Sequence, residues 1–312
     1  MEKPRALAIF ENKIICDMKV CVIGGANMDI CATSAGPFVA GDSNPGTVRM
    51  APGGVGRNIA HNLALLGDQV RLVTIFGADG FGRMLRDSCK AAGLDLSLSQ
   101  MVPGARNACF VSLNGCDGEL LGGVADMAVT GLMTPDWLES RLNRINEADV
   151  VVADTNLRAD TLELLVACCL PPLYIDAVSS AKAVRLREAL AAPRLPGAGP
   201  VFIKCNRLEA EVLGVRPHVT EGVSVPSAIS RLYVSLGSEG LQIVEEGNVT
   251  SFPALPVTGI VNATGAGDAL LAGIVHAGPA APAAEAALLG QKCAGMSMQS
   301  PDAVNEAVRT LA

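Results

Sequence analysis

The stretch VNATGAGDALLAG (261–273) sets three glycines and an aspartate at the start of an apolar helical pattern. Small residues in a first helical turn leave the backbone N–H groups open to a ligand, and these groups and the helix dipole stabilise negative charge. We therefore expect an anion hole formed by Gly265, Ala266 and Gly267 at the start of this helix. The hydroxyl of Thr264 is a suitable helix cap.

Asp268 follows these residues on the same turn. A carboxylate is common there because it complements the helix dipole. A phosphoryl transferase also needs a base near the acceptor hydroxyl, beside a cradle for the transferred charge. The stretch contains no lysine of the kind that a phosphate-binding loop carries. It therefore favours a kinase whose anion hole is backbone amide and whose carboxylate, Asp268, accepts the proton.

The composition of the 312 residues narrows the class of protein. Half of them are hydrophobic and the net charge is -7, which argues against a nucleic-acid partner. Ten cysteines are scattered without a CxxC pair, a pattern typical of a reducing compartment. No apolar run reaches the length of a membrane span, and residues 1–17 look like an extension rather than a signal peptide. We expect a cytoplasmic protein without a membrane anchor.

Strand and helix patterns alternate along most of the chain, which predicts a mostly parallel sheet covered by helices on both faces. This is a three-layer α/β/α architecture in one domain, 18–312. The expected strands are 18–25, 70–77, 149–154, 173–176, 201–205 and 232–237. The expected helices are 56–67, 80–92, 160–169, 181–191, 207–213, 265–277, 282–298 and 302–311.

Two segments break this rhythm, about 31–52 and 96–125. They contain short alternating runs and a turn at Asn114–Gly118, which predict antiparallel strands outside the main sheet. Ligands of open α/β sheets bind beyond the carboxyl ends of the strands. A small β lid over those ends is the simplest interpretation.

Two Gly-rich stretches early in the chain suit a sugar. In GGANMDI (24–30), Asn27 and Asp29 lie two residues apart, so both can hold vicinal hydroxyls, although a turn also favours these residue types. In PGGVGRN (52–58), glycines allow close approach of a ligand at a helix start and an amide offers both donor and acceptor. The residues concerned are Gly53, Gly54 and Asn58.

Two further stretches suit a nucleotide and its metal ion. In KCNRLEAE (204–211), Asn206 and Glu209 share one face of a helix start, which fits Mg²⁺ bound through water and equally fits a capping box. The strand VSLGSEG (234–240) ends in glycines that let the backbone pass close to a nucleotide.

In this order, these stretches resemble the ribokinase-like (PfkB) family of sugar and nucleoside kinases, from about residue 18 to 308. The resemblance implies that Asp268 is the catalytic base, that the amides of residues 265–267 form the anion hole, and that Asn206 and Glu209 organise Mg²⁺. It implies a sugar site at Asn27, Asp29, Gly53, Gly54 and Asn58. ATP contacts are implied at Lys182, Asn206, Ser235, Gly237, Gly240, Thr264 and Asn305.

Two features depart from the family pattern. Asn262 replaces an aspartate that many members carry before the signature threonine; its carbonyl and that of Thr264 remain able to bind K⁺. The segment 215–231 is shorter than family members usually need for the helix that precedes the strand 232–237. The resemblance also implies a homodimer formed through the lid.

Within the family, the segment 41–67 closely resembles bacterial pseudouridine kinases, which implies the 5′-hydroxyl of pseudouridine as acceptor. Contacts to that nucleoside are then expected from Asp42, Ser43, Asn44, Asp126 and Asn156. Two alternatives remain open. One is a kinase of the same fold for ribose, adenosine or a keto-deoxy sugar acid, and the other is a ligand-binding homologue without turnover.

Overall fold

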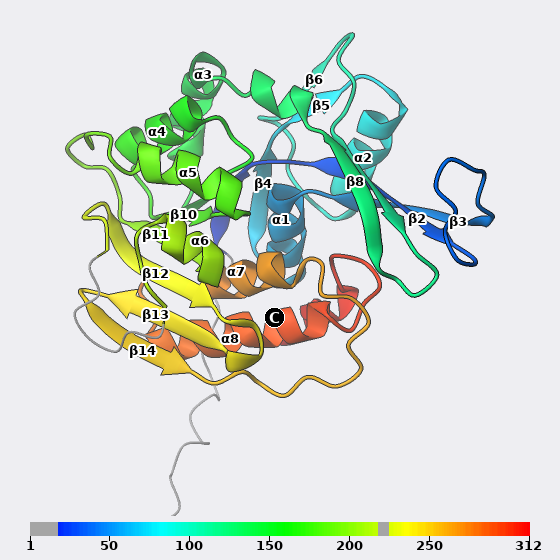
Figure 1. Cartoon of the computed structure of the whole chain (residues 1–312). Coiled ribbons are helices and arrows are strands. Elements are labelled where there is room, and N and C mark those ends of the chain that lie inside the picture. Colours follow the sequence, from blue (N-terminus) through cyan, green and yellow to red (C-terminus); the bar gives the residue numbers. More distant parts are fainter. Residues whose placement is uncertain (1–17, 218–224) are drawn as a thin grey trace, which may run out of the picture.

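The computed structural model describes residues 18–217 and 225–312, and its centre is an eight-stranded sheet (Figure 1). Neighbouring strands are parallel except at one edge of the sheet, where β12 pairs with β13 and β13 pairs with β14 in antiparallel orientation. The order across the sheet is β14 (Asn248–Phe252), β13 (Leu241–Glu245), β12 (Ile229–Ser235), β11 (Val201–Asn206), β10 (Leu173–Asp176), β9 (Val150–Asp154), β1 (Lys19–Ile23) and β4 (Gln69–Val73).

Helices cover both faces of this sheet and enclose two hydrophobic cores. One face carries α1 (Val55–Leu65), α7 (Ala266–Ala277) and α8 (Ala283–Ser297). The other carries α3 (Pro135–Ile145), α4 (Ala159–Cys168), α5 (Ser180–Ala189) and α6 (Arg207–Val212). The three-layer fold expected from the sequence is therefore confirmed.

Strand β9 shows why the central strands are continuously apolar. Its five residues are all buried, with Val150 and Val152 in one core and Val151 and Ala153 in the other. Successive side chains of a strand point to opposite faces, so a sheet covered on both sides needs apolar residues at every position. The run ends in Asp154, at the edge where ligands of such sheets bind.

The lid is a separate four-stranded sheet of order β3-β2-β7-β8 at the right of Figure 1. It differs from the expected segments in two ways. It begins at Asn27 rather than near residue 31, and residues 96–108 lie outside it because β6 pairs with β5 instead. The pair β2–β7 is parallel, and the other two pairs are antiparallel. The strands are β2 (Asn27–Ser34), β3 (Gly46–Gly53), β7 (Cys109–Asn114) and β8 (Leu120–Asp126).

The remaining elements are helix α2, which adds Leu85 and Cys89 to one hydrophobic core, and short strands and 3₁₀ turns. Only a 3₁₀ turn, η3, forms within the expected C-terminal helix 302–311, and the β13–β14 hairpin was not expected from the sequence. Among the described residues, no helix combines the length and apolar character that crossing a membrane requires, and the nine cysteines found there are free. These elements are α2 (Gly80–Ala91), β5 (Ile75–Gly77), β6 (Gln100–Val102), η1 (Ala128–Leu132), η2 (Gly237–Glu239) and η3 (Glu306–Leu311).

Candidate active site

Helix α7 begins with a glycine in the left-handed region. Gly265 has φ 85° and is the N-cap, and no side chain caps the helix, so the expected cap by Thr264 does not form. A Cβ at Gly265 would overlap the carbonyl oxygen of Ala303. Only glycine fits this conformation and this contact. The turn brings the start of α7 against the C-terminal loop.

Asp268 is buried in the first turn of α7 and receives a hydrogen bond from α1. The Nδ2 of Asn58 donates to its Oδ2 at 2.9 Å. Burial raises the pKa of Asp268 to about 7, and the nearby charge of Asp176 adds to the shift, whereas Asn58 and Lys204 oppose it. A carboxylate with a pKa near neutrality is well matched to accept a proton from a hydroxyl.

A lysine also reaches the expected anion hole, although the 261–273 stretch contains none. Lys204 extends from β11, and a Cβ placed on Gly267 would lie 2.6 Å from its Nζ. The Nζ donates to Oδ2 of Asp176 at 3.1 Å, and both side chains are buried. Burial lowers the pKa of the Lys204 ammonium, but the carboxylates of Asp176 and Asp268 raise it more, so the net shift is upward. The positive charge therefore lies beside the glycine amides.

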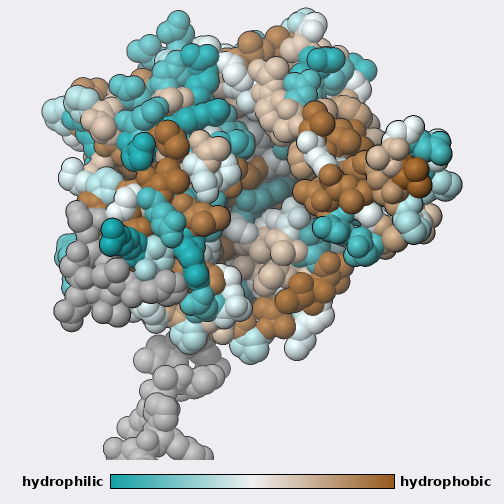
Figure 2. Space-filling view, viewed as in Figure 1, coloured by the Kyte–Doolittle hydropathy of each residue, from teal (hydrophilic) through white to brown (hydrophobic). Residues whose placement is uncertain are grey.

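Two cavities flank the start of α7. The first, about 570 Å³, includes Ala266 and Gly267 in its wall together with three residues expected to contact a nucleotide: Ser235, Gly237 and Gly240. The second, about 580 Å³, lies under the lid. Figure 2 shows the surface hollowed between the lid and the body of the molecule. Residues lining the second cavity include Asp29, Arg49, Phe110, Asn262, Thr264 and Asp302.

Of the expected sugar-binding residues, Asp29 lines the second cavity, and Asn27 and Gly53 contact Asp29. Nδ2 of Asn27 donates to Oδ1 of Asp29 at 2.6 Å at the start of β2. Burial raises the pKa of Asp29, while the Asn27 bond and the charge of Arg57 oppose that shift. A Cβ on Gly53 would overlap the Asp29 carboxylate, so this glycine permits the close approach.

Gly54 continues this wall into α1. Its φ is 100°, and a Cβ would lie 2.5 Å from the carbonyl oxygen of Gly25. The two glycine turns therefore pack backbone to backbone, which places Asn58 at Asp268. The structure thus brings together five of the expected acceptor-site residues: Asn27, Asp29, Gly53, Gly54 and Asn58.

Asp154, which was not singled out from the sequence, joins these loops. It is fully buried. Its Oδ2 accepts from the N–H groups of Gly25 at 2.9 Å and Gly56 at 2.8 Å. Its Oδ1 accepts from the N–H of Asn156 at 2.8 Å. Burial raises the pKa of Asp154, and the bonds from Gly25 and Asn156 oppose the shift. One carboxylate thus positions the turn before β2, the start of α1 and the end of β9.

The lid is joined to the C-terminal loop across the second cavity. Arg49 of β3 forms an ion pair with Asp302 and donates from Nη1 to the carbonyl oxygen of Pro301 at 3.3 Å. Nδ2 of Asn262 donates to the same carbonyl at 3.1 Å. Through the Pro301 carbonyl, the lid is therefore connected to the loop that precedes α7.

Asn206 and Glu209 form a capping box at the start of α6. Asn206 Nδ2 donates to Glu209 Oε1 at 2.7 Å, and burial raises the pKa of Glu209. No cluster of three or more metal-ligating side chains occurs within the described ranges 18–217 and 225–312. The carboxylates of Asp176 and Glu209 lie near Lys204, and their charges raise its pKa. Such oxygen donors, some already hydrogen-bonded, fit Mg²⁺ held through its own water better than a directly ligated ion.

Other expected site residues lie elsewhere in the structure. The side chain of Asn44 holds its own turn by hydrogen bonds to Val39, and Asp126 pairs with Arg106 at 3.3 Å. Asn305 caps η3 by accepting from the N–H of Ala307. Asp42 and Ser43 are exposed in the β2–β3 loop, and Asn156 and Lys182 line a third cavity.

The fold and site point to a class of enzyme, the phosphotransferases, because a buried carboxylate follows a glycine-rich helix start whose neighbouring residues line two cavities. The chain belongs to the pfkB family of carbohydrate kinases, whose sequence profile matches residues 17–310. This family membership makes it a sugar or nucleoside kinase that transfers a phosphoryl group to a hydroxyl.

Individual relatives agree with this assignment. The chain is 33% identical to the pseudouridine kinase of Escherichia coli K12 over 288 residues, which are 89% of this chain and 90% of that protein. A carbohydrate kinase from Agrobacterium tumefaciens superposes with a TM-score of 0.77 at 27% identity, covering 94% of this chain and 96% of that one. Arabidopsis thaliana ribokinase complexed with ribose and ATP superposes with a TM-score of 0.78 at 18% identity, covering 94% and 97%.

Proposed function

We propose that this protein is an ATP-dependent pseudouridine kinase that converts pseudouridine to pseudouridine 5′-phosphate. One observation carries the proposal: Asp268, held by Asn58, is buried on a helix start that contributes Ala266 and Gly267 to one cavity and follows Thr264 of the other, with the ammonium of Lys204 beside Gly267. The similarity to the E. coli pseudouridine kinase supports the choice of acceptor. The Arabidopsis ribokinase solved with ribose and ATP supports the choice of donor.

In this proposal Asp268 accepts the proton of the 5′-hydroxyl. The hydroxyl oxygen forms a bond to the γ-phosphorus of ATP as the bond from that phosphorus to the ADP oxygen breaks. The amides at the start of α7 and the Lys204 ammonium stabilise the negative charge on the transferred group. Mg²⁺, when bound with ATP, would neutralise phosphate charge, with Asn206 and Glu209 holding its water shell. K⁺ would interact with the carbonyls of Asn262 and Thr264.

The lid cavity supplies contacts for a nucleoside. In the proposal Asp29 binds ribose hydroxyls, and the Phe110 ring, which lines the same cavity, stacks on a base. Its volume of about 580 Å³ lies within the usual range of small-molecule sites. Pseudouridine contacts from Asp42, Ser43, Asn44, Asp126 and Asn156 stay predictions, as do nucleotide contacts from Lys182 and Asn305.

A panel of acceptors tests the substrate. The protein is incubated with ATP, Mg²⁺ and pseudouridine, uridine, adenosine, inosine or ribose, with KCl or NaCl as the salt. We expect the highest kcat/KM for pseudouridine, because specificity is the ratio of these constants among competing substrates. A higher kcat/KM for ribose or adenosine would leave the kinase assignment standing and exclude pseudouridine as its preferred acceptor.

The outer face of the lid supports a homodimer. Along β3, β2, β7 and β8, residues facing the cavity alternate with apolar residues on the other face. Val48 and Val124 are each 71% exposed there, and Met50 is 52% exposed. Figure 2 shows apolar surface gathered over the lid. Such a face is typical of an interaction site.

Light scattering after size exclusion tests the dimer. We expect the mass of two chains for the wild type and of one chain for Val124→Glu, whereas the exposed Val39→Glu outside the lid strands retains the dimer. A monomeric wild type would exclude this interface. Within the cell, the free cysteines fit the reducing cytoplasm.

A further inference from the structure

Arg57 is a buried cation that the proposed reaction leaves without a role. It lies in the first turn of α1, directly before Asn58, and is only 5% exposed. This turn contains no acidic residue, and the positive end of a helix dipole disfavours a cation there. Burial lowers the pKa of the guanidinium, which shows that its charge is held in an unfavourable place. The contacts of the side chain explain why a cation is kept at this position.

One end of the guanidinium holds the side chain of Asn58. Nη1 of Arg57 donates to Oδ1 of Asn58 at 3.1 Å, and both side chains are buried. On its other side, Nδ2 of Asn58 donates to Oδ2 of Asp268 at 2.9 Å. The backbone of Asn58 is held as well, because its carbonyl oxygen accepts from Nδ2 of Asn62 at 2.9 Å. The amide therefore lies between a cation and the carboxylate of Asp268.

The chemistry of these three groups selects one orientation of the amide. A guanidinium can only donate hydrogen bonds, and an ionised carboxylate can only accept them. The amide satisfies both when its oxygen faces Arg57 and its NH₂ group faces Asp268. The opposite orientation would set the NH₂ group against the guanidinium and would offer the amide oxygen to a protonated Asp268. By fixing the first orientation, Arg57 favours the ionised form of Asp268.

The other end of the guanidinium is anchored to neutral groups. Nη2 lies 3.2 Å from Nδ1 of His61 and donates to Oγ of Ser88 at 3.5 Å. Burial and the charge of Arg57 lower the pKa of His61 to about 4, so the imidazole is neutral and its Nδ1 accepts from Arg57. Nη1 also donates to the carbonyl oxygen of Pro52 at 3.3 Å. These contacts hold the guanidinium against Asn58 without neutralising its charge.

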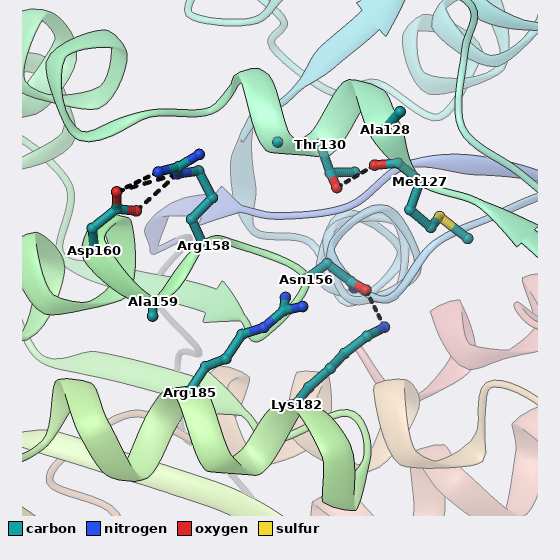
Figure 3. Close-up of a pocket in the computed structure, with 10 residues that line it drawn as sticks. Met127, Ala128, Thr130, Asn156, Arg158, Ala159, Asp160, Lys182 and Arg185 are labelled. Atoms are coloured by element: carbon teal, nitrogen blue, oxygen red, sulfur yellow. Dashed lines mark hydrogen bonds and ion pairs between the residues drawn. The ribbon is translucent and has the colours of Figure 1, made fainter.

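A second amide is held by a cation in the same way. Oδ1 of Asn156 accepts from Nζ of Lys182 at 2.5 Å (Figure 3). Its Nδ2 lies on the side of Gly25, since a Cβ placed on that glycine would be 3.1 Å from it. In both pairs the amide oxygen faces the cation, and the NH₂ group is left for the partner on the other side.

We propose that Arg57 is a positioning residue, which fixes the amide of Asn58 so that its NH₂ group is held on the Asp268 carboxylate and keeps that base ready to accept a proton. Arg57 acts through Asn58 rather than by contact with the transferred group. The inference rests on the proposed role of Asp268 as the base, and it holds for whichever hydroxyl is phosphorylated.

Titration of Asp268 itself tests this role. The chain is labelled with aspartate that carries ¹³C in the side-chain carboxyl group, and the Asp268 resonance is identified as the one that Asp268→Asn removes. In Arg57→Met we expect the pKa of Asp268 to rise by about one unit, because the Asn58 donor is no longer fixed on the ionised form. The profile of kcat/KM should move with it, so that kcat/KM is about fivefold below wild type at about pH 7 and within about twofold of it at about pH 9.

The other charged groups that act on Asp268 are the same in both proteins. Besides burial, the carboxylates of Asp176 and Asp154 raise the pKa of Asp268, and the Lys204 ammonium lowers it. Because Arg57→Met leaves these groups in place, a pKa shift in that variant originates at Arg57.

A double-mutant cycle shows whether the effect passes through the amide. If Arg57 acts through Asn58, Arg57→Met adds no further pKa shift in an Asn58→Ala background. If the lost charge acts directly on Asp268, the shift has the same size in both backgrounds, and the proposal is overturned. Ser88→Ala is the matched control, because it removes another contact of Arg57 but leaves Nη1 on Asn58, so the wild-type pKa should persist.

An unchanged pKa of Asp268 in Arg57→Met also overturns the proposal, whatever happens to kcat. If that variant does not fold, Arg57→Gln takes its place, since a glutamine side chain ends where Nε of arginine lies and has no group at the position of Nη1. The same shift is then expected, and an unchanged pKa counts equally against the proposal. A wild type that does not phosphorylate pseudouridine would change the proposed substrate and leave this titration unaffected.

Discussion

Replacement of Asp154 by asparagine should reveal how one buried carboxylate organises the acceptor side. Oδ2 accepts from the N–H groups of Gly25 and Gly56, and Oδ1 accepts from that of Asn156. An asparagine side chain has one acceptor oxygen, so in its better orientation it keeps the two glycine bonds and turns its NH₂ group towards the N–H of Asn156. Two donors then face each other in a buried place.

The expected loss of stability follows from that single lost hydrogen bond. A buried donor left without a partner costs about 1–3 kcal/mol. Relief of the buried charge offsets part of this, and the opposite side-chain orientation costs more because it leaves two donors unpaired. At roughly 2–4 °C for each kcal/mol, we expect Tm to fall by about 2–12 °C.

The kinetic effect should fall on the KM for the acceptor rather than on the KM for ATP. Because the three bonded loops carry the proposed acceptor site, Asp154→Asn should raise the KM for the acceptor about tenfold, equivalent to about 1.4 kcal/mol, and leave the KM for ATP within about twofold. Asp149→Asn is the matched control, because this exposed carboxylate caps the other end of the sheet through one bond to the N–H of Lys19 at 2.8 Å. Wild-type Tm and acceptor KM in Asp154→Asn, or an equal rise in both KM values, would refute this reasoning.

Three other perturbations have defined outcomes. A pH profile of kcat/KM should rise through about pH 7 to a plateau, because Asp268 with a pKa of about 7 must be deprotonated to act as a base; a profile flat from pH 5 to 8 (about three units, bracketing that pKa) would contradict this. The same raised pKa means that the native state holds this proton more tightly than the unfolded chain, so the stability it contributes is lost as pH rises from about 4 to about 7. Lys204→Met should destabilise the fold by about 3–5 kcal/mol because it leaves Asp176 buried and unpaired. Lys204→Met/Asp176→Asn should restore much of the Tm without restoring kcat, and recovery of kcat would exclude a catalytic role for the lysine. Arg49→Ala should raise the KM for the acceptor and change stability by less than about 1 kcal/mol, because both partners of its ion pair are about half exposed; an unchanged KM would show that the lid does not depend on this contact.

Local patterns in the sequence were sufficient for the main sheet and the start of α7. The structures of β9 and of the glycine turn before Asp268 can be predicted from a few neighbouring residues. The alternation of side chains along a strand and the backbone freedom of glycine both depend on the local sequence alone. The role of Lys204 is not local. A lysine inside an apolar strand is the signal that was available, since lysine is seldom buried without a partner, but the sequence does not show that Gly267 is the group it faces.

Asp154 illustrates the same limit at longer range. Its partners Gly25 and Gly56 lie 129 and 98 residues away in the chain, so only the folded topology brings them to one carboxylate. The lid bounds were misplaced for a related reason. Asn27 and Asp29 come just after the expected strand 18–25, and only their pairing with β3 and β7 shows that a new strand starts there.

The most direct test of the account is phosphoryl transfer from ATP to pseudouridine by the wild type and by Asp268→Asn, followed by ³¹P NMR of the product. The wild type should form pseudouridine 5′-phosphate and ADP in equal amounts. Asp268→Asn should bind ATP with unchanged affinity but lose at least about 100-fold in kcat, because general base catalysis is typically worth 10²–10⁴. An Asp268→Asn enzyme with wild-type kcat would contradict the central claim that this carboxylate takes the proton of the acceptor hydroxyl.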